Sequence, residues 1–274
     1  MTTASAREST PPIFRLRGLR KAFAGREVLR GIDLDVDTGE TLVVMGPSGC
    51  GKSVMLKHLV GLLKPDSGRI EFHGTPIQAA NEKMLIPIRR RIGFLFQQAA
   101  LFDSLNVFEN VAFPLRETGQ AGLDLKTKVR ETLDRVGLAD TVDRMPAELS
   151  GGMRKRVALA RAIILNPEII LYDEPTTGLD PIRANVINDL IVRLQRDLNI
   201  SSIVVTHDLD SAFQVGDRMV LLHHGVCHLE GTPEVFRTTD DPIARNFLEG
   251  RDSDGIDGAT SRGTLATPGR EATS

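Results

Sequence analysis

The sequence predicts an α/β fold with a mixed, largely parallel sheet, an N-terminal antiparallel part and an inserted α-helical lobe. Short continuous apolar runs recur along the chain with helical patterns between them, which is typical of a parallel sheet covered on both faces. Alternating apolar residues precede the first such run, and residues 98–166 have helical periodicity. We expect one domain over residues 13–250, an N-terminal tail over 1–12 and a polar C-terminal tail over 251–274.

The strands follow from two kinds of apolar pattern. Near-alternation over residues 28–36, after the short run 13–16, is typical of antiparallel strands with one covered face. Continuous runs such as TLVVM (41–45) and EIILY (168–172) are typical of strands covered on both faces. Further strands are expected at 92–96 and 201–207, and a hairpin over 219–231.

The helices follow from 3.6-residue periodicity and its interruptions. One helix is expected to follow the strand TLVVM and end near Gly61, and another to cover residues 182–198. Within the long helical stretch, we expect Pro114, Gly137 and Pro146 to break the periodicity into separate helices.

Composition restricts the setting in which the chain works. The 34 Lys and Arg and 36 Asp and Glu give a formal net charge of −2, so no overall basic field favours nucleic acid as a partner. Two cysteines, Cys50 and Cys227, are too few for a disulfide framework and favour a reducing compartment. The segment MTTASAREST lacks the apolar core of a signal peptide, and no apolar run approaches the ~20 residues that span a bilayer. We expect a soluble cytosolic chain that reaches a membrane only through a partner.

The segment GPSGCGKS, residues 46–53, has the pattern G-x-x-x-x-G-K-[ST] between a predicted strand and a predicted helix. Backbone N–H groups of such a phosphate loop, together with the helix N-terminus, bind the phosphates of a nucleotide. Lys52 adds a positive charge, and Ser53 offers a hydroxyl to Mg²⁺. The flanking strand and helix disfavour a glycine turn without a ligand, so we expect a P-loop NTPase core. The residues predicted to bind the nucleotide are Gly46, Pro47, Ser48, Gly49, Cys50, Gly51, Lys52 and Ser53.

Polar residues at the ends of three predicted strands complete a hydrolytic site. Asp173 follows EIILY and can hold Mg²⁺, while Glu174 can orient and deprotonate the attacking water. Gln97 follows IGFLF and can contact Mg²⁺ or the water, and His207 follows SSIVVT and can contact the γ-phosphate. Each residue alone is also what a strand end or a capped turn contains. Their common position after strands favours the catalytic interpretation.

A second glycine-rich helix start, LSGGM, occupies residues 149–153. Ser150 can cap the helix, and Gly151 and Gly152 allow the backbone to approach a phosphate, which the helix dipole attracts. By itself, the segment also fits an ordinary serine-capped helix.

The order of motifs resembles the nucleotide-binding domain of ABC transporters. The phosphate loop, Gln97, LSGGM, YDEP, GLDP (178–181) and TH (206–207) follow one another, and the resemblance covers about residues 13–248. It implies that the chain binds and hydrolyses ATP with Mg²⁺. It also implies a head-to-tail pair of identical chains, in which residues 149–153, the signature segment, close over ATP on the partner's phosphate loop.

The resemblance assigns three further positions. Phe23 corresponds to the aromatic residue that stacks on adenine, where the family more often has Tyr. Asp180 corresponds to the acid that communicates across the dimer. Met153 replaces the usual Gln of the signature, so no contact is assigned to that side chain, while the backbone contacts of the segment are expected to be retained.

Residues 95–117 and 241–255 resemble the ATPase of Mla-type (MCE-associated) phospholipid transporters. This implies a motor subunit that moves phospholipid to or from the cell envelope, held peripherally at the cytoplasmic face of the inner membrane by an integral-membrane permease. An MCE-domain lipid-binding subunit and a small STAS-domain protein are further implied partners. The alternatives are an ABC ATPase for another substrate and a soluble regulatory ABC ATPase without a permease.

Several segments have two interpretations. The apolar residues after Gln97 either pack the helical lobe or receive a coupling helix from a permease; they are Leu101, Phe102, Val107, Phe108, Val111 and Phe113. The run Arg89, Arg90 and Arg91 suggests a solvated edge or an anionic partner.

Three other features also have alternatives. The group formed by His223, His224, Cys227 and His228 suggests a hairpin turn or a metal site. Cys50 fills a variable loop position or has a pKa lowered by the helix terminus. The tail over 251–274 is disordered or contacts another subunit.

Overall fold

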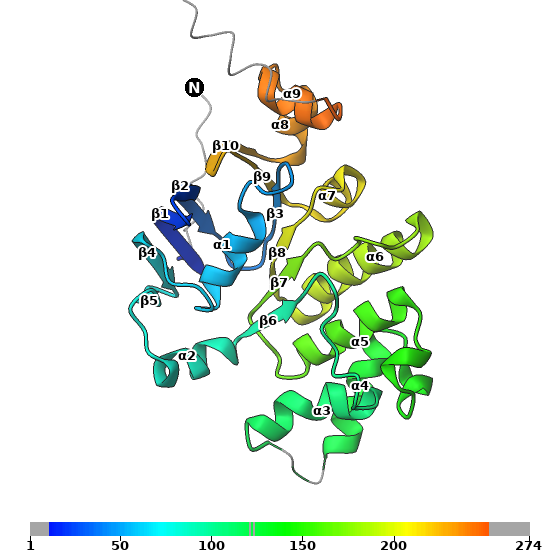
Figure 1. The fold of residues 1–274 in the computed structure, drawn as a ribbon. Coiled ribbons are helices and arrows are strands. Elements are labelled where there is room, and N and C mark those ends of the chain that lie inside the picture. Colours follow the sequence, from blue (N-terminus) through cyan, green and yellow to red (C-terminus); the bar gives the residue numbers. More distant parts are fainter. Residues whose placement is uncertain (1–10, 121, 123, 252–274) are drawn as a thin grey trace, which may run out of the picture.

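Two sheets form the centre of the computed structural model, which describes residues 11–120, 122 and 124–251 (Figure 1). The predicted α/β fold class is therefore confirmed. Most of the two predicted tails, 1–12 and 251–274, lies outside the described residues. In the part of the chain that the structure describes, no helix has both the length and the apolar character needed to cross a bilayer.

The first sheet is antiparallel and comes from the N-terminal part of the chain, as predicted. In spatial order, its strands are β2 (Arg26–Val36), β1 (Phe14–Phe23), β4 (Ser67–Phe72) and β5 (Thr75–Pro76). The hairpin β4–β5 was not predicted, because β4 alternates the buried Ile70 and Phe72 with the charged Arg69 and Glu71 over only six residues.

The second, main sheet is parallel except at one edge, where β10 runs antiparallel to β9. In spatial order, its strands are β10 (Val226–Gly231), β9 (Arg218–His223), β3 (Thr41–Met45), β8 (Ser201–Val205), β7 (Ile169–Asp173) and β6 (Ile92–Leu95). Every residue of β3, β7 and β8 is buried, which explains their continuous apolar sequences. The carboxyl ends of β3, β6, β7 and β8 lie at one edge, where ligands of parallel sheets bind.

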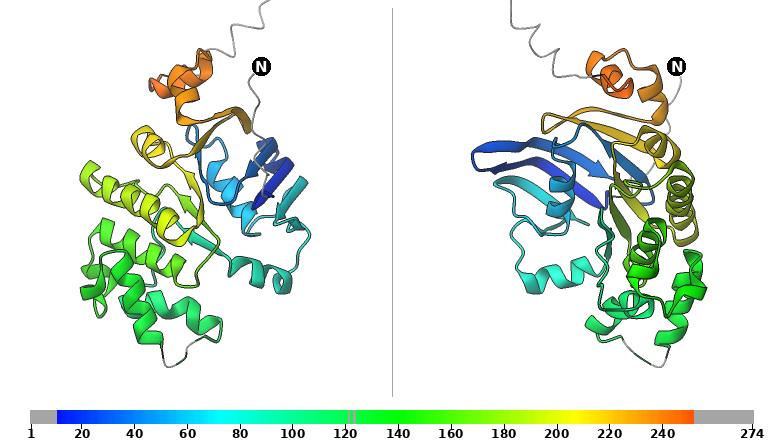
Figure 2. Two further views of the ribbon diagram at one scale, coloured as in Figure 1. Left: turned by 180° about the vertical axis from the view of Figure 1, so that it is seen from behind. Right: turned by 45° about the vertical axis from the view of Figure 1, so that its right-hand side comes forward.

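Helices cover both faces of the main sheet. The helices of the described residues are α1 (Lys52–Leu59), α2 (Glu82–Arg89), α3 (Val107–Glu117), α4 (Leu125–Arg135), α5 (Gly151–Ile163), α6 (Pro181–Leu198), α7 (Leu209–Val215), α8 (Pro233–Thr238) and α9 (Pro242–Leu248), with short 3₁₀ turns at Ala139–Thr141 and Pro146–Glu148. Leu42 and Val44 of β3 face a core shared with α1 and the antiparallel sheet. Val43 and Met45 face the opposite core, which α3, α4, α5 and α6 complete (Figure 2).

The predicted break at Pro114 is wrong, because α3 continues through this residue. A capping box formed by Asn106 and Glu109 fixes the start of α3, and Val111 and Leu115 are buried one turn apart. This packing outweighs the hydrogen bond that proline removes. The breaks at Gly137 and Pro146 are confirmed, since one follows α4 and the other begins a 3₁₀ turn.

The arginine run at 89–91 is not simply a solvated edge. Arg89 donates hydrogen bonds to the carbonyl oxygen of Val60 at 2.8 Å and to Glu82 at 2.7 Å. Arg91 donates to Glu168 at 2.8 Å and lies over the ring of Phe72. Arg90 and Arg91 are both exposed, as predicted for a solvated edge, but the contacts of Arg89 and Arg91 hold those two side chains against neighbouring elements.

Candidate nucleotide-binding site

The phosphate loop, residues 46–53, connects β3 to α1 and depends on its glycines. Gly46 has φ 149°, and a Cβ there would overlap the carbonyl oxygen of Leu222. Gly51 has φ 108°, and its Cβ would lie 2.6 Å from Leu29. The Nζ of Lys52 donates to the carbonyl oxygens of Gly46 at 2.7 Å and Pro47 at 2.9 Å, which holds its charge within the loop.

Ser53 and Asp173 place two oxygen groups side by side. The Ser53 hydroxyl donates to Oδ1 of Asp173 at 2.6 Å, and burial raises the pKa of that carboxyl. A hydroxyl and a carboxylate are hard oxygen ligands of the kind that Mg²⁺ uses beside substrate phosphates. These two side chains therefore fit a magnesium ion, as predicted from their positions.

Glu174 follows β7 in an unusual backbone conformation. Its φ is 51°, a value in the left-handed region that non-glycine residues seldom adopt, and its amide donates to Val205 at 2.9 Å. Its Oε2 accepts a hydrogen bond from Thr177 at 3.1 Å and lies 2.8 Å from Nδ1 of His207. Strained backbone of this kind concentrates at functional sites.

A cavity of about 280 Å³ brings the strand-end residues together. Of the residues predicted at strand ends, Gln97, Glu174 and His207 line it, next to Lys52 and Ser53 of the phosphate loop. Phe23 ends β1 and is 43% exposed, with Nζ of Lys21 5.5 Å from its ring centre, and it does not line this cavity.

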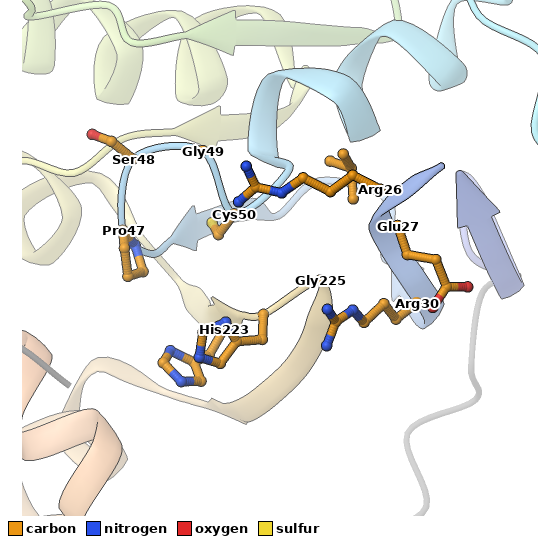
Figure 3. Close-up of a pocket in the computed structure, with 11 residues that line it drawn as sticks. Arg26, Glu27, Arg30, Pro47, Ser48, Gly49, Cys50, His223 and Gly225 are labelled. Atoms are coloured by element: carbon orange, nitrogen blue, oxygen red, sulfur yellow. The ribbon is translucent and has the colours of Figure 1, made fainter. Parts of the chain in front are cut away.

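A second cavity of about 170 Å³ also borders the phosphate loop (Figure 3). Ser48 and Gly49 of this loop line both cavities. Arg26 and Arg30 of β2 line it and were not predicted. Simple alternation along β2 does not predict them, because the pairing of β2 with β1 is irregular between Glu27 and Leu29, and Glu27 lines the same cavity. The two guanidinium groups give this side of the loop positive charge.

The cysteine and histidine alternatives receive no support from the geometry. Burial raises the pKa of Cys50, contrary to the lowered value considered above, so its thiol stays protonated. Burial also raises the pKa of Cys227 to about 12. Nε2 of His228 lies 2.9 Å from Asp241, the residue that caps α9. No cluster of His, Cys, Asp or Glu suited to a metal ion occurs in residues 11–120, 122 and 124–251.

The signature segment lies apart from both cavities. Ser150 caps α5, and its Oγ accepts a hydrogen bond from the amide of Met153 at 3.3 Å. Gly151 and Gly152 form the first turn of α5. Asp180 caps α6 by accepting from the amide of Arg183 at 3.0 Å. None of Ser150, Gly151, Gly152 and Asp180 lines either of these two cavities.

This fold and these loops define a P-loop nucleotide hydrolase, and comparisons with known proteins define its family. Residues 29–177 match the family described as ABC transporter. The chain is 44% identical over 237 residues to the probable ribonucleotide transport ATP-binding protein Mkl of Mycobacterium leprae, covering 86% of this chain and 68% of that protein. It is 42% identical over 244 residues to the intermembrane phospholipid transport system ATP-binding protein MlaF of Haemophilus influenzae, covering 89% of this chain and 92% of that protein.

A solved structure agrees with the sequence comparisons. The dimeric ATP-binding cassette MJ0796 bound to ADP and Pi has a TM-score of 0.74 and 33% sequence identity, and covers 80% of this chain and 98% of that one. The chain belongs to the ABC transporter family and is an ABC-type ATPase.

Proposed function

We propose that this ATPase is the motor subunit of a transporter that moves phospholipid to or from the cell envelope through a separate permease. The observation that carries the proposal is the similarity to MlaF, a phospholipid transport protein by name, over 92% of its length. Ribonucleotide transport is the second candidate, because the identity to Mkl is slightly higher at 44%. That match covers only 68% of Mkl, which favours phospholipid.

The phosphate loop and the strand ends support the proposed roles in ATP hydrolysis. Lys52 binds the β- and γ-phosphates, and Ser53 and Asp173 hold Mg²⁺. Gln97 lines the same 280 Å³ cavity as Lys52 and Ser53. The bound ion would neutralise phosphate charge. Glu174 orients the water and accepts its proton, while His207 holds the Glu174 carboxylate.

The proposal includes a head-to-tail pair of identical chains. Ser150, Gly151 and Gly152 form an N-terminal helix turn that lines neither of the two cavities beside the phosphate loop, and such a turn binds anions. In the pair, this turn closes over ATP on the partner's phosphate loop. Asp180 communicates across the pair, and Phe23 stacks on adenine.

An apolar groove supports docking of a permease beside the Gln97 loop. The groove, about 360 Å³, is lined by Phe94, Phe96, Phe102 and Phe113, and the rings of the last two are 4.7 Å apart. Arg89, Arg90 and Arg161 also line it, so the groove combines aromatic and basic residues. The other members of the predicted apolar cluster pack in or against the core of α3, α4, α5 and α6; they are Leu101, Val107, Phe108 and Val111. We propose that a coupling helix of an integral-membrane permease occupies the groove and holds the chain at the cytoplasmic face of the inner membrane. An MCE-domain subunit and a STAS-domain protein complete the proposed complex.

The test is transport by the assembled complex. The chain is co-expressed with the membrane subunits encoded beside its gene, purified in detergent and reconstituted into vesicles. ATP-dependent transfer of labelled phospholipid, absent with Glu174→Gln, is expected. ATP-dependent uptake of a labelled ribonucleotide without lipid transfer would support the second candidate. Failure of any membrane subunit to co-purify would favour a regulatory ATPase.

A further inference from the structure

Lys155 is a buried cation that the proposed nucleotide site does not use. It lies in α5, only 5% exposed, and its Nζ donates a hydrogen bond to the backbone oxygen of Glu174 at 3.0 Å. Within residues 11–120, 122 and 124–251, this oxygen is the only hydrogen-bond acceptor of the ammonium group. Burial lowers the pKa of Lys155 to about 8. A buried ammonium with a single hydrogen-bond acceptor is costly, although the nearby carboxylates of Glu174 and Asp173 offset part of that cost. Packing alone therefore does not explain a lysine here.

Glu174, the residue that Lys155 contacts, is one of the non-glycine residues with a positive φ. Glu174 holds φ 51°, and such a conformation persists only where surrounding contacts impose it. The same backbone oxygen also accepts a longer hydrogen bond, 3.3 Å, from the amide of Thr177. Thr177 and the other polar partners of Glu174, Val205 and His207, all belong to segments at the edge of the main sheet. Lys155 supplies the contact from a different element, the helix that begins at the signature segment.

The helix makes this contact sensitive to the signature segment. Lys155 follows Gly151 by four residues, so the two lie about 6 Å apart along the axis of α5, within the same rigid stretch. A displacement of Gly151 by about 1 Å therefore carries Lys155 with it. That displacement is enough to break a hydrogen bond of 3.0 Å.

We propose that Lys155 is a positioning residue that transmits the state of the signature segment to the backbone of Glu174 in the same chain. This inference rests on the proposed head-to-tail pair, because the signature segment then contacts ATP on the partner's phosphate loop. Contact with that ATP fixes the position of α5. Lys155 then fixes the orientation of the Glu174 peptide group and hence the direction of its carboxylate. Each chain thus coordinates its own hydrolysis with nucleotide binding at the other site.

Lys155→Met tests the proposal in the full-length chain, because methionine fills the space without donating a hydrogen bond. We expect unchanged ATP affinity and thermal stability at or above wild type, since an apolar side chain replaces a buried charge. We expect kcat to fall about 10- to 100-fold, the range for a misplaced catalytic group, and the cooperativity of ATP hydrolysis to disappear. Lys155→Arg retains a hydrogen-bond donor and should therefore keep part of the wild-type kcat and part of the cooperativity.

Arg156→Met is the matched control. Arg156 is the next residue of α5 and also donates to backbone oxygens, those of Val136 and Gly137, but does not contact Glu174. Its substitution should leave kcat and cooperativity unchanged. An equal loss of kcat in Arg156→Met and Lys155→Met would overturn the proposal, as would a Lys155→Met protein that is unstable or binds ATP poorly.

Mixed dimers test whether the effect stays within one chain. One chain carries Glu174→Gln, so only the other chain hydrolyses ATP. Lys155→Met on the hydrolysing chain should lower the rate, and the same change on the Glu174→Gln chain should not. Equal effects from both placements contradict the proposal. If Lys155→Met behaves as wild type while Gly151→Asp abolishes hydrolysis, the proposed role of Lys155 is wrong and the proposed head-to-tail dimer stands. If Gly151→Asp hydrolyses ATP normally, both proposals are wrong.

Discussion

The phosphate loop and the signature segment are both glycine-rich helix starts, but their glycines have different surroundings. A Cβ at Gly46 would overlap the backbone of Leu222, and one at Gly51 would lie 2.6 Å from the side chain of Leu29 and 3.1 Å from the backbone oxygen of Val28. At Gly151 and Gly152, a Cβ would meet its nearest neighbours at 3.6 Å, an ordinary contact. The fold of this chain therefore requires the glycines of the phosphate loop and leaves those of the signature segment unexplained. A requirement for glycine in the signature segment has to come from outside the chain, as a partner's nucleotide would supply it.

Among the variants that test this comparison, Gly151→Asp is expected to have the largest effect, a loss of ATP hydrolysis. The Asp carboxylate would face the partner's γ-phosphate, so repulsion between like charges and lost access to backbone N–H groups oppose closure. Hydrolysis should fall to background, while ATP binding stays near wild type because the phosphate loop is untouched. ATPase assays and isothermal titration measure the two effects. Gly151→Ala is the control for size alone, and normal hydrolysis by Gly151→Asp would reduce the signature segment to a helix cap.

Mixing complementary variants checks the same prediction in the dimer. Lys52→Ala should lose tight ATP binding but keeps its signature segment. In a mixed dimer with Gly151→Asp, one interface combines an intact phosphate loop with an intact signature segment, and the other carries both defects. ATP-dependent association should appear in the mixture and in neither variant alone. Association that is equal in all three samples would contradict pairing between chains.

The next effect in size is expected from Glu174→Gln. The amide oxygen can still accept hydrogen bonds where Oε2 now does, but the variant lacks the base, so hydrolysis should be ~10²–10⁴-fold slower. ATP binding should remain, and dimers should accumulate with ATP because closure no longer leads to turnover. Size-exclusion chromatography with ATP measures the dimers. Near-normal turnover would mean that Glu174 is not the base.

A smaller effect is expected on stability, where alanine should be tolerated less well in the phosphate loop than in the signature segment. Gly46→Ala places a methyl group against the backbone at a positive φ, so the free energy of unfolding should fall by at least about 2 kcal/mol. Gly151→Ala adds a methyl group in ordinary contact at a helical position and should change it by less than about 1 kcal/mol. Urea denaturation of both variants provides the measurement. Equal losses would remove the distinction between the loops.

The sequence predicted the parts of the fold that depend on local pattern. The continuous apolar runs at β3, β7 and β8 lie where expected, because strands buried on both faces have few polar residues. The polar residues that they do contain lie at or next to the strand ends; they are Thr41, Asp173, Ser201 and Ser202. The helix α2 was missed because it is only eight residues long and contains Pro87. Pro114 was misinterpreted because packing of α3 on its neighbours overrides the local preference of proline.

The candidate site was predictable to the extent that strand ends determine it. Glu174 and His207 meet because both follow parallel neighbouring strands, β7 and β8. The contact between Lys155 and Glu174 was not predictable, because it depends on how α5 packs against the sheet and joins a side chain to a backbone oxygen. Residue type and spacing carry no signal for such a contact. The catalytic and binding roles of these residues stay predictions that the variants test.

The smallest expected effect concerns Ser150 and separates its two possible tasks. Its Oγ accepts the Met153 amide at 3.3 Å, a long bond, so Ser150→Ala should lower the free energy of unfolding by only about 0.5–1 kcal/mol. Glycine is nearly as good a cap, so Ser150→Gly should lower the free energy of unfolding by only roughly a few tenths of a kcal/mol. If the hydroxyl also contacts the partner's nucleotide, both variants lose it equally. ATPase activity should then fall about 10-fold in both, as for a lost hydrogen bond to a charged group, although their stabilities differ. Activity that follows stability, with Ser150→Gly near wild type, would instead show that the serine of the signature segment serves its own helix, as the glycines of the phosphate loop serve their own fold.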